Sequence, residues 1–262
     1  MALRTDDPFA ASPPPPHEKL RNIVTAHRVA LLKLGYEPIP ILSGRKRPPM
    51  NGWQDVRITI PPDEDVITPW ADVYRGALST GIRTRYTPGF DIDIRDQDVA
   101  DQVERALLNM IPQQGTVLKR VGLPPKRLIP FRCVTPFKKI SATFKAPDGV
   151  THKVEVLADG QQFVAEGIHE TTQQPYRWAD NVSLLNVAHE QLPLVDEALA
   201  RRFVAEAGEI MRRAGWVEVG AKTNGKTNGK GNRNTANESA KTETPGSSIY
   251  GRTALSVRPK TF

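Results

Sequence analysis

The segment 89–94, GFDIDI, alternates between apolar and acidic side chains and runs directly into a pattern with helical spacing. Successive side chains of a strand point to opposite faces, so the apolar residues are expected in a core while Asp91 and Asp93 share the other face. A helix is expected over 97–111, with Asp96 as its N-cap, because apolar residues recur there at three- and four-residue intervals. The chain must therefore fold around a strand that carries two carboxylates on one side and leads straight into a helix.

Other segments predict further helices and several strands. A helix is expected over 18–34, where apolar residues follow helical spacing up to a glycine, and another over 198–211. The proline-interrupted segment 36–42 is typical of an edge strand. Period-two patterns predict strands at 127–134, 140–146, 152–157 and 162–167. The last two are expected to pair as a hairpin through the turn 158–161. We therefore expect a mixed α/β or α+β domain with a largely antiparallel sheet.

Composition divides the chain into a folded part and two flanking segments. The arm 1–16 is rich in proline, and the segment 220–262 is dominated by Lys, Thr, Asn and Gly, with too little apolar surface to fold. We predict that both are disordered and that the domain spans 17–219. The segment 222–262 carries eight Lys and Arg against two acids, a charge of +6, so the rest of the chain is almost neutral at +1.

The composition also excludes several classes of protein. No apolar run approaches the ~20 residues that span a membrane, and the N-terminal segment lacks the apolar stretch of a signal peptide. The chain has one cysteine, so no internal disulfide can form, and its five histidines lack ligand spacing, which argues against structural zinc. We expect a soluble cytoplasmic protein.

Charge within the near-neutral part is segregated along the sequence. Residues 91–104 contain six acids and one arginine, whereas residues 106–147 contain eight Lys and Arg and no acid. An acidic segment beside a basic one suits a protein that handles both metal ions and phosphates. Two solvated faces of opposite charge would give the same composition.

Asp91, Asp93 and Glu155 are the candidate metal ligands. Two carboxylates on one strand face repel each other unless a cation, a proton or a basic side chain lies between them. Glu155 alternates with valines on the strand 152–157, and it would complete a carboxylate platform if that strand neighbours the one with the aspartates. Such a platform could hold two divalent ions ~4 Å apart, which suits phosphoryl transfer. The simpler alternative is a solvated strand face.

The segment KRVGLPPKRLIPFR, residues 119–132, is the candidate phosphate-binding element. A rigid turn around its glycine and two prolines separates two pairs of cations. The cations that we assign to the site are Arg120, Lys126, Arg127 and Arg132. Such an array could clamp a triphosphate or a nucleic-acid backbone, and a solvated loop is the alternative.

A match to the phosphate-loop pattern GxxxxGK[ST] occurs at 220–227, GAKTNGKT. A working phosphate loop needs a buried strand before it and a helix after it. No apolar stripe follows this match on which a helix could pack, so we interpret it as a chance match in low-complexity sequence. The basic tail could still hold nucleic acid electrostatically.

In their order along the chain, these motifs resemble the N-terminal domain of the bifunctional DNA primase/polymerases of phage and plasmid replication proteins, within the archaeo-eukaryotic primase superfamily. The resemblance covers residues 18–180. It rests on the order of GYEPIPILSGRKRPPMNGW, ALSTG, GFDIDIRD, the basic segment and VEVLADGQQFVAEGIHETTQQPYRW. It implies an α+β primase-polymerase fold, with an RRM-like catalytic half packed on an N-terminal α/β half and a largely antiparallel sheet.

The resemblance also implies roles for individual residues. Asp91 and Asp93 match the first catalytic motif of the family and Glu155 the third, together binding Mg²⁺ or Mn²⁺. The second motif, commonly Ser-x-His, is absent, and the basic segment stands in its place, which leaves nucleotide preference and activity open. We assign the basic segment to the triphosphate or the template, and His169 to the nucleotide.

We therefore hypothesise a template-directed nucleotidyltransferase that makes primers or extends DNA, with single-stranded DNA as template and NTPs or dNTPs as substrates. Larger relatives continue into a helical segment and often a helicase. The chain is thus expected either to recruit a replicative helicase in trans or to be a truncated form. Two other functions stay open: a non-catalytic DNA-binding replication-initiation protein and a metal-dependent nuclease.

Overall fold

Two antiparallel sheets organise the part of the chain that the computed structural model describes, residues 16–55, 64–112 and 114–220. The smaller sheet has the strand order β1-β2-β8, and the larger has the order β10-β6-β7-β3-β5-β4-β9. The predicted arm 1–16 and tail 220–262 lie, apart from their innermost residues, outside the described residues. Their disorder and the domain bounds 17–219 therefore stay predictions.

The elements have the following bounds. The smaller sheet contains β1 (Pro38–Ile41), β2 (Ser79–Arg83) and β8 (Gln162–Glu166). The larger contains β3 (Gly89–Asp93), β4 (Arg120–Val121), β5 (Arg127–Pro130), β6 (Ile140–Lys145), β7 (Thr151–Leu157), β9 (Arg177–Trp178) and β10 (Val217–Glu218). The α-helices are α1 (Pro16–Lys33), α2 (Glu64–Ile67), α3 (Trp70–Val73), α4 (Gln97–Met110) and α5 (Glu197–Arg213). The 3-10 helices are η1 (Trp53–Asp55), η2 (Ala179–Asn181) and η3 (His189–Gln191).

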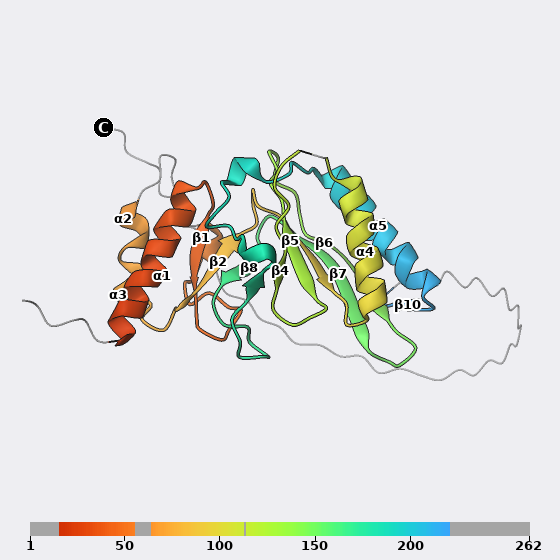
Figure 1. Cartoon of the computed structure of the whole chain (residues 1–262), viewed down its shortest axis with the longest axis horizontal. Coiled ribbons are helices and arrows are strands. Elements are labelled where there is room, and N and C mark those ends of the chain that lie inside the picture. Colours follow the sequence, from red (N-terminus) through yellow and green to blue (C-terminus); the bar gives the residue numbers. More distant parts are fainter. Residues whose placement is uncertain (1–15, 56–63, 113, 221–262) are drawn as a thin grey trace, which may run out of the picture. The chain divides into compact units, whose positions relative to one another are not determined.

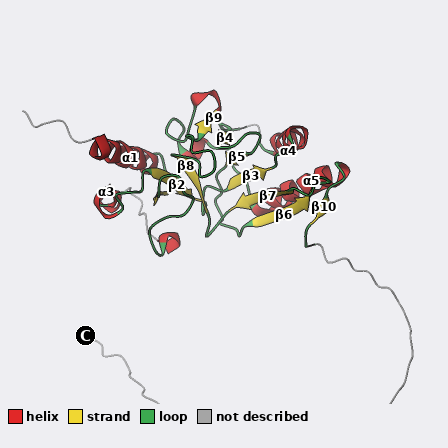
Figure 2. Ribbon diagram, turned by 90° about the horizontal axis from the view of Figure 1, so that it is seen from below, coloured by secondary structure: helices red, strands yellow, loops and turns green. Residues whose placement is uncertain are grey.

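Helices α4 and α5 pack on one face of the larger sheet, and both lie on the same side of β3, β6 and β7 in Figure 2. The core between them contains the apolar residues of β3, namely Phe90 and Ile92, together with Ile94, all of them fully buried. Asp91 and Asp93 point to the other face and are partly exposed. The alternation in the sequence therefore predicted the two faces of this strand correctly.

Helix α4 begins where the sequence predicts. The carboxylate of Asp96 accepts a hydrogen bond of 2.9 Å from the backbone N–H of Val99, which satisfies one of the free amides at the start of the helix. Only two residues separate β3 from this N-cap, so the helix is held directly at the end of the strand that carries the aspartates.

The smaller sheet lies beside α1, as Figure 1 shows on its left side. β1 is an edge strand, in agreement with its prolines, and α1 covers the predicted helical segment except its last residue. Arg28 of α1 is fully buried and donates hydrogen bonds to the carbonyls of Ala77 and Ser79, at 2.6 and 2.9 Å, which ties the helix to the start of β2. β2 was not predicted, because each of its residues is buried and its sequence therefore lacks alternation.

The predicted hairpin of 152–157 with 162–167 is wrong. β7 pairs with β3 and β6 in the larger sheet, whereas β8 pairs with β2 in the smaller one. The chain does turn at 158–161, but the turn is bonded to Thr84, which follows β2. The Thr84 hydroxyl donates a hydrogen bond of 2.5 Å to the carbonyl of Ala158, and the Thr84 N–H donates one of 3.1 Å to the carbonyl of Gln161. Turn residues indicate a reversal of direction, not which strand pairs next, so the sequence could not show this crossing between sheets.

The fold is α+β with mostly antiparallel strands, as predicted. The strand expected over 127–134 is shorter, since β5 ends at Pro130. After it, the backbone N–H groups of Phe131 and Cys133 donate hydrogen bonds to carbonyls of the loop before β3. In the described part of the chain, every helix is too short or too polar to cross a membrane.

We expect Asp96→Ala to lower the free energy of unfolding by about 1 kcal/mol, because the first turn of α4 loses its side-chain acceptor. Urea unfolding followed by circular dichroism measures this change. Gln102→Ala, an exposed position in the middle of the same helix, serves as the control and should change stability by less than about 0.5 kcal/mol. Equal stability of the two variants would contradict the role of the cap.

Candidate active site

Strand register places three carboxylates on one face of the larger sheet. β3 lies between β7 and β5, and Asp91 is directly opposite Glu155 on β7 and Leu128 on β5. Opposed residues of antiparallel strands point to the same face. Asp91, Asp93 and Glu155 therefore lie together on the face away from α4 and α5. The condition that the strand of Glu155 neighbours that of the aspartates is met.

Lysine side chains lie beside two of these carboxylates. Lys126 forms an ion pair with Asp93. Glu155 Oε1 lies 2.5 Å from Lys139 Nζ and 3.4 Å from Lys153 Nζ. Asp93 Oδ1 and Glu155 Oε1 are both buried, and neither receives a hydrogen bond of good geometry. Basic side chains thus supply the positive charge that neighbouring carboxylates require.

Asp91 forms no ion pair within the described residues. Burial raises the pKa of its carboxyl to about 6. The charge of Arg120 opposes this shift of the pKa, whereas the charges of Asp93 and Glu155 add to it. A cation placed beside Asp91 would therefore relieve an unfavourable arrangement of negative charge.

The described residues contain no cluster of three or more His, Cys, Asp or Glu side chains that is arranged to hold a metal ion. The donor types nevertheless suit a divalent ion, because Mg²⁺ and Mn²⁺ prefer carboxylate oxygens. An ion bound to Asp93 and Glu155 would have to replace their lysine partners.

A cleft opens over the aspartates and brings together most of the predicted site residues. It is lined by Asp91, Asp93, Arg120, Lys126, Arg127 and His169. The aspartates come from β3, the cations from the segment 119–132 and the histidine from the loop after β8. Segments far apart in the sequence therefore converge on one polar hollow.

Two predicted residues lie outside the walls of this cleft. Glu155 faces the same side of the sheet as Asp91 but does not line the hollow. Arg132 is directed elsewhere, since its Nε donates a hydrogen bond of 2.9 Å to the carbonyl of Leu192. The catalytic and nucleotide-binding roles assigned from the sequence stay predictions.

A family model for the N-terminal domain of bifunctional DNA primase/polymerases, Prim-Pol, matches residues 28–194, more than half of the chain. The chain belongs to the Prim-Pol family. No curated protein shows significant similarity to it. Membership supports a primase/polymerase-type function in replication, which implies DNA and nucleotides as substrates, and the family is generally metal-dependent.

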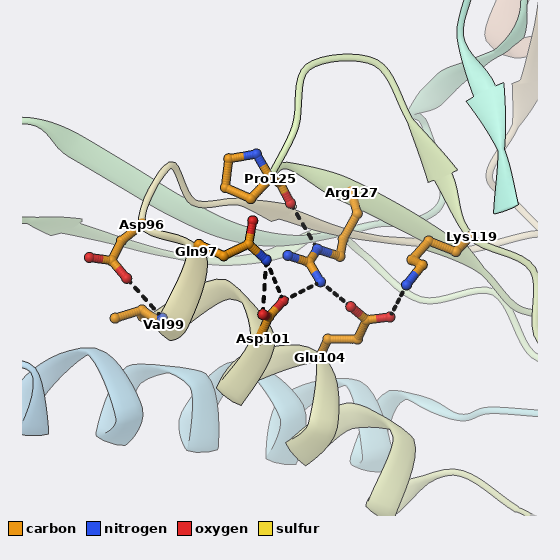
Figure 3. Close-up of polar contacts among 8 residues, drawn as sticks. All are labelled: Asp96, Gln97, Val99, Asp101, Glu104, Lys119, Pro125 and Arg127. Carbon is orange, nitrogen blue, oxygen red and sulfur yellow. Dashed lines mark hydrogen bonds and ion pairs between the residues drawn. The ribbon is translucent and has the colours of Figure 1, made fainter.

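Arg127 of this Prim-Pol domain lines the cleft, but its guanidinium points toward α4 (Figure 3). It is opposite Ile92 in the register of β5 with β3, so it points to the helix side of the sheet. Its Nη1 lies 2.8 Å from Asp101 Oδ1 and also pairs with Glu104. Its Nε donates a hydrogen bond of 2.8 Å to the carbonyl of Pro125. Arg127 therefore ties the proline turn of the basic segment to α4.

We expect Arg127→Ala to lower the free energy of unfolding by about 2 kcal/mol, because the buried Glu104 loses one of its two cationic partners and keeps only Lys119. Denaturant unfolding measures the loss. The control Arg105→Ala removes an exposed cation from α4, the helix that carries Glu104, and should change stability by less than about 0.5 kcal/mol. If the two variants unfold alike, the ion pairs of Arg127 do not stabilise the fold.

An aromatic wall holds the buried Arg120. Its guanidinium lies 4.3 Å from the ring centroid of Tyr176, and it also donates a hydrogen bond to the carbonyl of Val164. His169 contacts the edge of Tyr176, with ring centroids 5.2 Å apart, and burial lowers the pKa of this histidine. Gly122 lets the rings approach: a Cβ there would lie 2.5 Å from Tyr176 Cε1. The cleft is thus lined by aromatic rings as well as by carboxylates.

Glu166, the last residue of β8, accepts a hydrogen bond of 2.9 Å from Trp178 Nε1. Burial raises its pKa from 4.5 to about 7, although the Trp178 bond and the charge of Arg120 oppose the shift. The folded state therefore binds the proton more tightly than the unfolded state. The stability that results is complete below a pH of about 4.5 and is lost as the pH rises through about 7.

We expect Glu166→Gln to be more stable than the wild type at pH 8, by on the order of 1–3 kcal/mol, because the amide is never charged. At pH 5 the difference should nearly vanish. Melting temperatures at the two pH values measure it, at about 2–4 °C per kcal/mol. A gain of equal size at both pH values would show that ionisation of Glu166 is not its cause.

Sequence reasoning missed several residues that line the cleft. Lys46 comes from the basic loop of residues 43–48, and its charge opposes the rise in the pKa of Asp91. Tyr176 and Phe163 come from segments after β7. The run of three cations at 45–47 was a usable signal for Lys46. No local pattern marks the two aromatic residues, because their position depends on the pairing of β8 with β2.

Proposed function

We propose that this Prim-Pol domain is a template-directed nucleotidyltransferase that synthesises primers or extends DNA in phage, prophage or plasmid replication. The observation that carries the proposal is the cleft, in which the carboxylates of β3 face cations of the segment 119–132. A polymerase must bind both metal ions and phosphates, and this hollow offers ligands for both. Family membership supports the same general function.

Asp91, Asp93 and Glu155 would hold Mg²⁺ or Mn²⁺. Their positions on adjacent strands and the raised pKa of Asp91 fit a site that gains from added positive charge. When bound, the metal would lower the pKa of the attacking 3′-hydroxyl and neutralise charge on the leaving pyrophosphate. The protein supplies a rigid ligand platform, since β3 is paired on both sides.

Lys126 has two roles in this proposal. In the structure described here it pairs with Asp93, and on the loop before β5 it lies at the wall of the cleft. Once a metal balances Asp93, the lysine is free to bind a phosphate of the incoming nucleotide. Arg120 and His169 would line the nucleotide site, with Arg120 held in place by Tyr176.

The remaining arginines of the basic segment would hold the loop in position. Arg127 is engaged by carboxylates of α4 and Arg132 by the carbonyl of Leu192. Arg127 could clamp a triphosphate only by breaking these contacts, and Arg132 does not line the cleft. We therefore propose that Arg127 fixes the turn that presents Lys126. Phosphoryl transfer depends mainly on positioning and charge neutralisation, so a fixed turn serves catalysis.

We expect Asp91→Asn and Asp93→Asn to reduce nucleotide incorporation by at least about 10²-fold, because each removes a negative charge that binds the metal. The assay contains the full chain, single-stranded DNA, labelled NTPs or dNTPs, and Mg²⁺ or Mn²⁺. Asp72→Asn, an exposed aspartate of α3, is the matched control and should keep full activity. Asp91→Asn should melt no lower than the wild type, because it relieves repulsion between carboxylates, whereas Asp93→Asn also loses the ion pair with Lys126 and should melt slightly lower.

The same assay separates the proposal from its two alternatives. Full synthesis by either site variant would overturn the assignment of the carboxylates. Metal-dependent degradation of the DNA that ignores added nucleotides would indicate a nuclease. Salt-sensitive DNA binding without synthesis, identical in wild type and variants, would indicate a non-catalytic initiation protein.

A further inference from the structure

A second hollow lies next to the cleft, between the basic loop 43–48 and η1. We call it the basic groove. Its walls include Arg45, Lys46, Arg47, Trp53 and Gln162. The three cations are exposed, and Trp53 is partly exposed. The groove therefore presents several positive charges around one large aromatic ring.

The groove keeps an excess of positive charge. The carboxylate on its wall is that of Glu170, whose Oε1 lies 4.0 Å from Arg45 Nη1. Both side chains are largely exposed, so this contact is weak and leaves Arg45 able to bind another anion. Lys46 and Arg47 form no ion pair within the described residues. An anionic ligand thus finds three cations opposed by one weakly bound acid.

Both walls of the groove are fixed by contacts with the smaller sheet. Gln162 of β8 donates a hydrogen bond of 2.5 Å to the carbonyl of Lys46, which holds the basic loop. On the other side, Arg83 of β2 donates to the carbonyl of Gln54, which holds η1. The ring of Trp53 packs against the core that contains Ile39 of β1. The groove is therefore preformed rather than assembled by a ligand.

The basic groove adjoins the cleft. Lys46 and Gln162 line both hollows. A polyanion that follows the groove would therefore reach the carboxylates of β3 by passing Lys46.

We propose that the basic groove binds single-stranded DNA and leads the template into the cleft; its role as a template path rests on the proposed polymerase function. Arginine and lysine would track successive phosphates, and a base would stack on Trp53. Cationic grooves with an aromatic platform are suited to single strands, because only unpaired bases expose a face for stacking. A duplex would use the cations but not the indole ring.

The proposal is tested by the affinity of the full chain for fluorescein-labelled oligothymidylate, measured by anisotropy at several salt concentrations without nucleotides or metal. Arg45→Ala/Arg47→Ala should weaken binding by on the order of tenfold at low salt, and should lower the slope of log affinity against log salt by about 1.4. The control Arg105→Ala/Arg202→Ala changes the net charge equally, but at exposed positions on α4 and α5. It should bind almost as the wild type does.

Fluorescence of the tryptophans supplies a direct readout of the contact with Trp53. Oligothymidylate should quench the emission of the wild type, and Trp53→Phe should lose most of that quenching while keeping the melting temperature within a few degrees. Equal quenching in both proteins would overturn the proposal, as would equal weakening by the two double variants. Neither measurement needs catalysis. An inactive protein that binds through the groove would refute only the polymerase function, and an active one indifferent to these substitutions would refute only the groove.

Discussion

The pairing of β3 with β5 and β7 determines nearly every feature of the candidate active site. The register that buries the apolar side of β3 under α4 and α5 also puts Asp91 opposite Glu155 on the other face. It turns Arg127 toward α4, while Lys126, one residue earlier, reaches Asp93. A slip by one residue would exchange the faces and bury the carboxylates in the core. The hydrophobic core thus enforces which face carries the charge, because a register shifted by one residue would expose the apolar side chains.

Local patterns were sufficient for the parts of the site that lie on one strand or at one helix end. Alternation over 89–94 predicted that Asp91 and Asp93 share a face, since this depends only on the period of a strand. The N-cap at Asp96 followed from the residue type and the helical spacing after it. The role of Glu155 required one further assumption, that its strand neighbours β3. Alternation indicated that the Glu155 side chain points away from the core, but not which strand lies next to its own.

Features that depend on pairing between distant strands were beyond the sequence. β8 leaves β7 after the turn and joins β2, so the aromatic residues Phe163 and Tyr176 reach the cleft by a route that no short motif reveals. Arg127 shows the same limit in another form. It stands beside Lys126 in a basic run, and composition treats the two alike. The register separates them, because adjacent residues at a strand end face opposite sides of the sheet. Lys126 therefore pairs with a carboxylate of β3, and Arg127 pairs with carboxylates of α4.

The cleft lies where the two sheets meet, and this explains how the proposed template path and the proposed metal ligands can be held in fixed relation. Leu128 of β5 and Phe163 of β8 belong to one buried cluster, and both crowd Gly89 of β3, where a Cβ would lie 3.0 Å from the phenylalanine ring. The strand of the aspartates is therefore packed directly on the strand that holds Lys46 through Gln162. The strands that carry the aspartates and Gln162 therefore cannot separate without opening this core. Apolar packing fixes these strands relative to each other, and the hydrogen bond of Gln162 then fixes the basic loop on them.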